Sequence, residues 1–389
     1  MKKVLIFLRE DAIAPKGGPS GYVYNLMKGL NENSIEFSLL PPTNNKSLKS
    51  RYDRLPLFIK SLYRICARYR DFKRLSVPTY GVTKEYLSQF DAIHFHSVFS
   101  LYKNIELLRN YKGKVILTSH CPKPPHRELV EDMYSNFERK IYGKKHLSVY
   151  EKIVEISFNR ADYIIFPCEE AEEPYINGWD KYAEIKKKNE YKYCYLPTGV
   201  DSCLEKIQYT RNEIRDKYNI PSEAFLISYV GRHNEVKGYD DLRKIAKYFS
   251  INDNVYFLIA GEENPLKRPA LPFWIEVGWT KDPYSLEAAS DLFILPNKET
   301  YFDLVLLEVL SLGIKVLISD TGGNKFFKKY KSDIYYFSNI NDAVEKIKKL
   351  KKDDCRGNNM KNRQLYLENF TSEKFAKNYI NILNKILSL

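Results

Sequence analysis

Two cations at a fixed spacing are the first residues of this chain that indicate specific chemistry. Arg232 and Lys237 lie in the segment Val230–Gly238, directly after an apolar run that is typical of a strand. A guanidinium fork and an ammonium group, with a glycine on each flank, can converge on a diphosphate. Two solvated surface cations in a loop are the alternative, and the spacing alone does not decide between them.

A second polar segment follows a later apolar run. The segment Pro296–Gly313 turns through a polar stretch and predicts a helix from about Asp303. Free amides at a helix start bind phosphate, and Glu308 on the second turn could accept two hydroxyls of a ribose. An ordinary helix with one acid near its start is the alternative.

A glycine-rich loop near the start of the chain is the third candidate. Residues Pro15–Gly21 follow the first predicted strand and open the helical stretch Tyr22–Leu30. Gly17 and Gly18 allow backbone amides to approach a ligand closely, and Ser20 could cap the helix. A plain strand-to-helix turn would have the same sequence.

These loops must be positioned by strands, and continuous apolar runs separated by helical stretches predict them. Such runs are typical of parallel sheets covered on both faces, so we expect an α/β protein with two doubly wound domains. The first series of predicted strands is Lys3–Leu8, Ile35–Leu40, Ala92–Phe95, Lys114–Thr118, Asp162–Phe166 and Tyr193–Leu196. The second series is Phe225–Val230, Val255–Ala260, Phe273–Val277, Leu292–Leu295, Lys315–Ile318 and Ile334–Phe337.

The boundary between the domains is expected near Leu196–Asp201, where a strand ends in proline and glycine. We place the first domain at residues 1–200 and the second at 201–371. The run 372–389 has apolar residues at helical spacing; it could dock on either domain, and we expect it to pack back on the first. Because ligands bind at the carboxyl ends of parallel strands, the site should lie in the cleft between the domains.

The net charge of +13, from 62 Lys and Arg against 49 Asp and Glu, is unevenly distributed. Residues 1–150 carry +13, residues 151–200 carry −3, and residues 201–389 carry +3. A basic field attracts nucleic acid, an acidic membrane surface or a phosphorylated substrate. No nucleic-acid-binding module is visible, so we expect no nucleic-acid partner.

Part of this excess lies in Arg51–Arg74, which has eight Lys and Arg and two Asp. Apolar residues three or four apart predict a helix with an apolar stripe beside a basic face. Such a helix could lie on anionic lipid, which we favour, or face the core with its basic side in solvent.

Cellular location and metal chemistry are constrained by what the sequence lacks. No apolar run approaches 18 residues, and the first residues do not form a signal-peptide core. The six cysteines include no Cys-x-x-Cys pair, so we expect reduced thiols in a cytoplasmic protein. The basic stretch Arg51–Arg74 would place this protein at the inner face of the cell membrane. No two aspartates stand two apart, so we expect neither a metal site nor a cofactor.

The three segments, their order and the linker Leu196–Asp201 resemble the GT-B glycosyltransferases of retaining family four, glycosyl transferases group 1, over essentially the whole chain. The specific part is Gly-Arg…Lys-Gly followed by Phe-Asp-Leu-Val-Leu-Leu-Glu and Gly-Gly. The resemblance implies two Rossmann-like domains facing a central cleft. It also implies a nucleotide-sugar donor, most simply a UDP-sugar.

The resemblance assigns the diphosphate site to the second domain. Arg232 and Lys237 would bind the diphosphate and stabilise it as it leaves, which makes both catalytic. The amides of Phe302, Asp303 and Leu304 would hold the distal phosphate.

The remaining roles come from the same resemblance. Glu308 would bind the ribose, Trp279 would lie near the base, and Gly17 and Gly18 would close on the donor. His120 would be a catalytic residue near the transferred sugar, although a strand-end histidine is as often structural. The basic stretch that follows it, Cys121–Glu128, is either an acceptor loop or a structural turn.

One departure from the family pattern concerns the donor sugar. The family has Glu, seven residues, then Glu, whereas Thr300 stands eight positions before Glu308 and Glu299 stands one position earlier. Either Glu299 compensates through a one-residue bulge, or Thr300 and Asp303 handle a different sugar.

The implied reaction is a metal-independent, retaining hexosyl transfer. The acceptor would be a saccharide or a lipid-linked saccharide in surface polysaccharide, capsule or glycolipid synthesis. A front-face substitution fits better than a covalent intermediate, because no carboxylate pair is suitably placed. A nucleotide-sugar epimerase of the same two-domain fold is the alternative enzyme.

Overall fold

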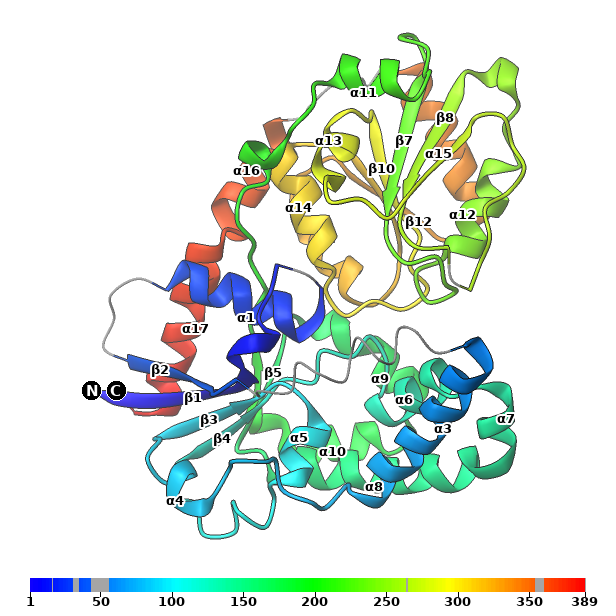
Figure 1. The fold of residues 1–389 in the computed structure, drawn as a ribbon. Coiled ribbons are helices and arrows are strands. Elements are labelled where there is room, and N and C mark those ends of the chain that lie inside the picture. The colour runs from blue at the N-terminus through cyan, green and yellow to red at the C-terminus, as the bar shows by residue number, and fades with distance from the viewer. Residues whose placement is uncertain (16, 31–34, 43–55, 264, 354–359, 389) are drawn as a thin grey trace.

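The structure is a computed structural model that describes all residues except 16, 31–34, 43–55, 264, 354–359 and 389. The described residues form two six-stranded sheets, each parallel throughout (Figure 1). We call the part built on the first sheet the first domain and the part built on the second sheet the second domain. The predicted α/β architecture of two doubly wound units is confirmed.

The first sheet has the strand order β2-β1-β3-β4-β5-β6. Its strands are β1 (Lys2–Arg9), β2 (Ile35–Leu40), β3 (Ala92–Phe95), β4 (Lys114–Leu117), β5 (Tyr163–Phe166) and β6 (Tyr193–Tyr195). The α-helices along this part of the chain are α1 (Gly18–Gly29), α3 (Leu57–Lys73), α4 (Lys84–Leu87), α5 (Val98–Lys103), α6 (Pro125–Met133), α7 (Asn136–Glu138), α8 (Lys144–Arg160), α9 (Glu173–Gly178) and α10 (Tyr182–Asn189). Shorter turns are η1 (Glu10–Ala12), η2 (Arg139–Gly143), η3 (Glu169–Glu172) and η4 (Glu190–Lys192).

The second sheet has the strand order β12-β11-β10-β7-β8-β9. Its strands are β7 (Phe225–Val230), β8 (Val255–Ala260), β9 (Trp274–Gly278), β10 (Leu292–Leu295), β11 (Val316–Ser319) and β12 (Ile334–Phe337). The helices are α11 (Arg211–Lys217), α12 (Tyr239–Ala246), α13 (Pro283–Ala288), α14 (Leu304–Leu312), α15 (Ile340–Lys352), α16 (Met360–Asn369) and α17 (Ser372–Ile386). Shorter turns are η5 (Leu204–Lys206), η6 (Ile251–Asp253) and η7 (Gly322–Lys329).

Alternate residues of the central strands enter different cores. In β1, Val4 and Ile6 pack in one buried cluster with α1 and α17, whereas Leu5 and Phe7 pack in another with α5 and α8. Burial on both faces explains why the strands are continuous apolar runs. For the same reason every predicted strand coincides with an observed strand to within one residue at each end.

The chain crosses between the two domains twice at one place. The backbone of Val200 pairs with that of Thr371, and the Val200 amide donates to the Phe370 carbonyl at 2.9 Å. A Cβ at Gly199 would lie 2.3 Å from the Thr371 carbonyl oxygen, so the linker approaches the second crossing only because residue 199 is glycine. The two crossings together form the connection between the domains.

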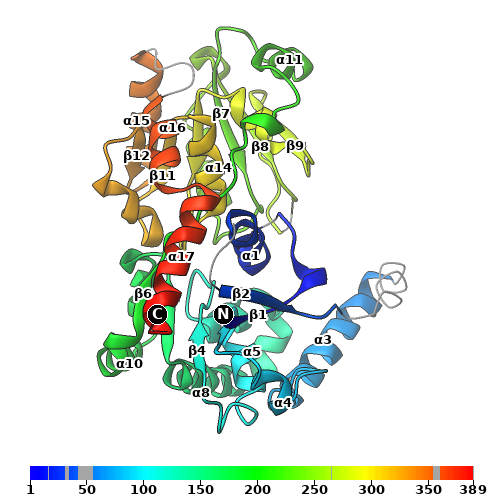
Figure 2. The same ribbon diagram turned by 90° about the vertical axis from the view of Figure 1, so that its left-hand side faces the viewer.

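After the second crossing, α17 lies against the first domain (Figure 2). Phe375 and Tyr379 are buried there, and the Phe375 ring lies 4.9 Å from that of Tyr22 on α1. A Cβ at Gly29 would lie 2.0 Å from the Ser372 carbonyl oxygen, so the end of α1 touches the start of α17. The last helix thus covers the face of the first sheet that carries the histidines described below.

Within the described residues, no helix is long and apolar enough to cross a membrane.

Candidate functional site

The loop after β7 holds its cations in place through its backbone. Gly238 has φ +65°, and a Cβ there would lie 1.7 Å from the Pro296 carbonyl oxygen. Only glycine therefore lets this loop approach the end of β10. The approach brings Lys237 Nζ to 2.5 Å from Asp303 Oδ1. Arg232 is exposed and has no ion pair within the described part of the chain.

The start of α14 carries amides that are free to bind an anion. Asp303 precedes the helix without making a capping hydrogen bond. The amides of Phe302, Asp303 and Leu304 donate to no acceptor among the described residues. The Asp303 carboxylate instead accepts hydrogen bonds from Lys237 and Asn297. The positive end of α14 and the Lys237 ammonium therefore lie together, as an anion site requires.

Two consecutive glycines lie behind this turn. A Cβ at Gly322 would lie 2.4 Å from the Thr300 carbonyl oxygen, and one at Gly323 would lie 2.0 Å from that of Tyr301. The Gly323 amide donates to the Thr300 carbonyl at 3.2 Å. The Thr300 side chain is buried, and its hydroxyl lies 3.2 Å from Asp303 Oδ2. Thr300 thus supports Asp303 from within the fold.

Glu299 lies where the two domains meet. Its Oε2 is 3.6 Å from Nζ of Lys123 in the first domain. The same ammonium group bonds to Glu131 at 3.2 Å and to Asp132 at 2.8 Å, and the Lys123 side chain is only 6% exposed. This contact could not be predicted from the sequence, because nothing in local spacing connects two residues so far apart. The role of Glu299 toward a sugar stays a prediction.

The stretch Cys121–Glu128, expected to be either an acceptor loop or a structural turn, contains the start of a helix. Pro125 begins α6, since proline fits the first turn of a helix. Lys123 is already paired with three carboxylates, and Arg127 Nε donates to an acid on α6 at 2.7 Å. Burial lowers the pKa of His126 to about 4, so its ring is neutral at pH 7.

Glu308 belongs to a polar cluster that includes α13. Burial raises the pKa of Glu308, while Lys206 and the Tyr284 hydroxyl act in the opposite direction. Glu287 on α13 is fully buried, and neither of its carboxyl oxygens has a hydrogen-bond partner among the residues that the structure describes. Burial, with Glu308 nearby, holds the pKa of Glu287 well above its usual value. Glu287 was not predicted from the sequence, because an isolated acid on a predicted helix carries no signal of burial.

Trp279 lies in the loop between β9 and α13 and is 72% exposed. The preceding Gly278 has φ +76°, and a Cβ there would meet nothing within 4 Å. The loop leads into α13, which carries Tyr284 and Glu287 beside Glu308. The contact of Trp279 with a nucleotide base stays a prediction.

The glycine-rich loop of the first domain is open on its outer side. A Cβ at Gly17 or at Gly18, which has φ +71°, would meet nothing within 4 Å. α1 begins at Gly18, earlier than predicted, and has no side-chain cap. The expectation that Ser20 caps α1 is wrong: its hydroxyl donates to the Ala12 carbonyl at 2.6 Å and accepts from the Ala14 amide at 2.9 Å. Ser20 therefore ties the loop before the helix.

His120 follows β4 and lies between the domains. Its ring centroid is 4.8 Å from that of Tyr22 on α1 and 6.3 Å from that of Tyr301 in the second domain. Its Nε2 is 2.8 Å from Nδ1 of His96, which follows β3. Burial lowers the pKa of His120 to about 3, so the ring is neutral. His96 was absent from the sequence prediction, although the pattern His-Phe-His places it at the same strand ends.

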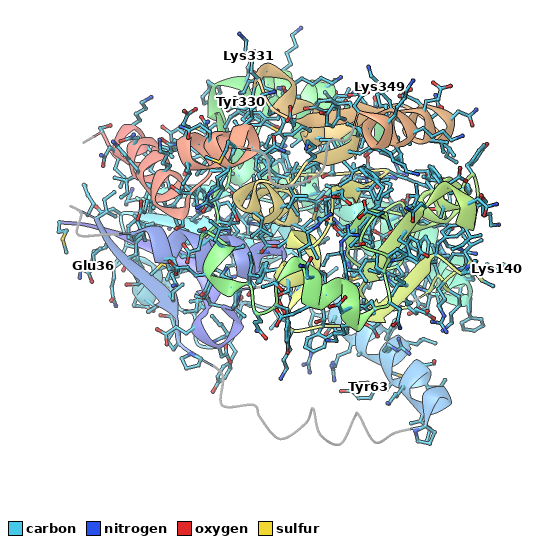
Figure 3. The ribbon with its side chains drawn as sticks, turned by 90° about the horizontal axis from the view of Figure 1, so that it is seen from above. Glu36, Tyr63, Lys140, Tyr330, Lys331 and Lys349 are labelled. Carbon is cyan, nitrogen blue, oxygen red and sulfur yellow. The ribbon has the colours of Figure 1, made fainter. Side chains whose placement is uncertain are left out.

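The basic stretch Arg51–Arg74 is described only from Pro56 onward, so Arg51 and Arg54 lie outside the described residues. Its helix, α3, extends outward from the first domain with Tyr63 on its outer side (Figure 3). Among the described side chains of α3, four large apolar ones are exposed: Ile59, Leu62, Tyr63 and Tyr69.

The opposite side of α3 packs on the first domain near its carboxyl end. The Phe72 ring stacks on that of His146 at a centroid distance of 3.6 Å, and Arg68 pairs with the buried Glu138. The alternative in which α3 faces the core with only its basic side in solvent describes one side of the helix. The other side is exposed and carries apolar residues, so the structure does not decide between the two alternatives.

In the part of the chain that the structure describes, no three or more His, Cys, Asp or Glu side chains are grouped to hold a metal ion.

Two family descriptions match this chain. Residues 16–181 match "Glycosyltransferase Family 4", and residues 210–365 match "Glycosyl transferases group 1". The two matches reach into both domains and include Gly17, Gly18, Arg232, Lys237 and Glu308.

Individual proteins show the same similarity. The O-antigen biosynthesis glycosyltransferase WclY of Escherichia coli is 23% identical over 323 residues, covering 78% of this chain and 81% of that protein. Sucrose-phosphate synthase from Thermosynechococcus elongatus has a TM-score of 0.68 at 16% identity, with all of both chains covered. Anabaena Alr3699/HepE in complex with UDP-glucose has a TM-score of 0.65 at 12% identity, covering 99% of this chain and 100% of that one.

Proposed function

Because this chain belongs to the glycosyl transferases of group 1 and has the GT-B fold, we propose that it transfers a hexose from a UDP-sugar to a saccharide or lipid-linked saccharide. The observation that carries the proposal is the proximity of Lys237 to the free amides at the start of α14, with Arg232 in the same loop as Lys237. Together they offer two positive charges and a helix terminus to one diphosphate.

The donor would lie between the two domains. Its diphosphate would contact the site just described, and its ribose hydroxyls would bind Glu308 on the second turn of α14. Its sugar would face His120 and the open backbone of Gly17 and Gly18. We propose UDP as the nucleotide of the donor, since HepE, which has the same fold, is in complex with UDP-glucose.

The proposed reaction retains the anomeric configuration. The acceptor oxygen forms a bond to the anomeric carbon on the face from which the diphosphate oxygen departs. The bond between that carbon and the phosphate oxygen breaks, and the departing oxygen takes the proton of the acceptor hydroxyl. Arg232 and Lys237 stabilise the negative charge that develops on the diphosphate. In other enzymes a divalent metal ion can stabilise the charge of a departing diphosphate. Here the two cations would have that role, so we propose a metal-independent enzyme without a cofactor.

The biological process is proposed from the relatives. WclY is named for O-antigen biosynthesis, which supports a role here in building a surface polysaccharide, capsule or glycolipid. The nucleotide-sugar epimerase considered above is not favoured, because the similar family descriptions are those of glycosyltransferases.

A transfer assay tests this function. The protein is incubated with radiolabelled UDP-sugars and membranes that contain lipid-linked saccharides, and the label is followed into the butanol-extractable lipid. We expect label in the lipid fraction only when acceptor is present. Label that stays in water as an epimerised UDP-sugar, with no need for acceptor, would overturn the proposal in favour of an epimerase.

We further propose that the first domain rests on the inner face of the cell membrane through α3 and the adjoining segment 137–145. Beside the exposed apolar residues of α3, Phe137 and Ile141 are also exposed, and they flank Glu138, which pairs with Arg68 of α3. Exposed cations lie among these apolar residues on both segments: Arg64, Arg70, Lys73, Arg139, Lys140, Lys144 and Lys145. Figure 3 shows Tyr63 and Lys140 on the outside of the molecule.

This combination fits anionic lipid, since apolar side chains can enter the headgroup boundary while cations meet the phosphates. Each cation near such a surface contributes about 1 kcal/mol. Vesicle sedimentation tests it with neutral and anionic lipid. We expect recovery with anionic vesicles only, and a decrease of roughly fivefold in partitioning for Arg64→Ala. Lys349→Ala, on α15 of the second domain, is the control, and equal recovery with both lipids would reject the proposal.

A further inference from the structure

Three histidines form a buried chain beside the proposed sugar site. His94 lies between Tyr379 Oη, at 2.8 Å from Nδ1, and Thr118 Oγ1, at 2.9 Å from Nε2. The His94 ring is 4.1 Å from that of His96, which is 2.8 Å from His120 through the contact of Nδ1 with Nε2. Only His120, at the end of the chain, is partly exposed.

The contact between His96 and His120 can hold one proton. A nitrogen–nitrogen distance of 2.8 Å is a hydrogen bond, so one ring donates and the other accepts. The other nitrogen of His96, Nε2, is buried and has no partner among the described residues. A buried N–H without an acceptor is rarer than a buried acceptor without a donor. The proton of His96 therefore belongs on Nδ1, from which it is donated to His120.

This placement fixes the proton of His120 as well. Because Nε2 of His120 accepts from His96, a neutral His120 must carry its own proton on Nδ1. That nitrogen has no hydrogen-bond partner within the described residues, and the residue is partly exposed. The N–H group thus points away from the pair and is free to reach a substrate.

The surroundings keep the pair neutral. The groups that contact these two rings from neighbouring elements are His94 of β3, Tyr22 of α1 and Tyr301 of the second domain. None of them is charged at neutral pH, and burial lowers the pKa of His96 well below its usual value. A proton added to His120 would also require His96 to move its own proton to the buried, unpartnered Nε2.

We propose that His96 is a positioning residue that holds His120 in the Nδ1–H form, so that His120 offers a hydrogen-bond donor to a sugar or phosphate oxygen. His120 then does not act as the general base for the acceptor hydroxyl, which agrees with proton transfer to the departing phosphate oxygen. The inference rests on the proposed function only for the identity of the oxygen that receives the bond. The proton arrangement itself belongs to the free protein.

Nitrogen NMR tests the arrangement without any assay. The full chain is labelled with ¹⁵N at its six histidines, and long-range proton–nitrogen correlations show which ring nitrogen carries the proton. We expect His120 protonated on Nδ1 and bare on Nε2, the reverse of the form that free histidine favours. His120 protonated on Nε2, or cationic at pH 7, would overturn the proposal even if sugar transfer is confirmed.

Two substitutions separate positioning from packing. His96→Leu removes the donor, and we expect His120 to shift toward the Nε2–H form, with kcat lowered about tenfold and the donor KM within twofold. His96→Asn keeps an N–H near the position of Nδ1, and we expect kcat within about threefold of the original. His146→Leu removes another buried histidine as a control. An unchanged His120 signal in His96→Leu would contradict the positioning role.

Discussion

The two sides of the site between the domains differ in the charge of the groups that they present. The second domain presents charge: Lys237 and Asp303 lie together at the start of α14, and Glu308 follows one turn later. Arg232 stands in the same loop as Lys237. The first domain presents neutral polar groups: His120 is an uncharged ring among aromatic side chains, and the backbone at Gly17 and Gly18 is open.

The contrast follows the chemistry expected of each half of a nucleotide sugar. A diphosphate needs cations and free amides, whereas sugar hydroxyls need neutral donors and acceptors at fixed positions. Part of the positive charge of the first 150 residues lies away from the site. This part includes the exposed cations of α3 and of residues 137–145.

The largest effect that this contrast predicts is at Lys237. Lys237→Ala removes one of the two charges offered to the diphosphate, and we expect kcat to fall by about 100- to 1,000-fold. Steady-state kinetics with a saturating donor measures the change. Lys349→Ala removes an exposed lysine of the same domain and should leave kcat unchanged. Near-normal turnover in Lys237→Ala would contradict the proposal that Lys237 stabilises the diphosphate.

A smaller effect is expected at Gly238, where only the backbone changes. Gly238→Ala would place a methyl group against the Pro296 carbonyl and impose an unfavourable φ, so the loop must move away from α14. We expect a loss of about ten- to a hundredfold in kcat, because displacement of a positioning element by an ångström is costly. Gly81→Ala, also at positive φ but with open space around it, is the matched control. Equal activity of the two variants would show that Lys237 does not depend on this loop geometry.

The smallest effect concerns stability and its pH dependence. Burial raises the folded-state pKa of Glu287 above its unfolded value near 4.3, so the folded protein binds the extra proton. Stability from this group is greatest below the unfolded pKa and is lost as pH rises toward the folded pKa. We therefore expect Glu287→Gln to raise Tm by a few degrees at pH 8 and to leave it unchanged at pH 4. A lower Tm at pH 8 would contradict the assignment of a buried acid without a partner.

The fold was predictable because both faces of each sheet are buried. Strands such as Leu292–Leu295 are uniformly apolar, and every predicted strand has its counterpart in the structure. The start of α6 was misread because a stretch dense in proline resembles a loop. Pro124 and Pro125 instead stand at the first residues of a helix, where proline is tolerated.

The charged side of the site was easier to predict than the neutral side. Arg232, Lys237 and Glu308 stand at short, recognisable spacings within one segment each, and their roles remain predictions from that pattern. The contact of Lys123 with Glu299 joins two domains, and the buried nitrogen of His96 depends on packing by Tyr22 of α1 and by His94. Neither long-range contact nor burial of a single atom can be predicted from local spacing.

The most direct test of the account is a thermal-shift panel with UDP-, GDP-, dTDP- and ADP-sugars on the full chain and on Lys237→Ala. A ligand that binds only the folded state at a hundred times its Kd stabilises it by about 2.7 kcal/mol. We predict that UDP-sugars raise the Tm of the original protein and that Lys237→Ala loses most of this increase. No shift with any nucleotide sugar, or an equal shift in Lys237→Ala, would contradict the assignment of the diphosphate to the second domain.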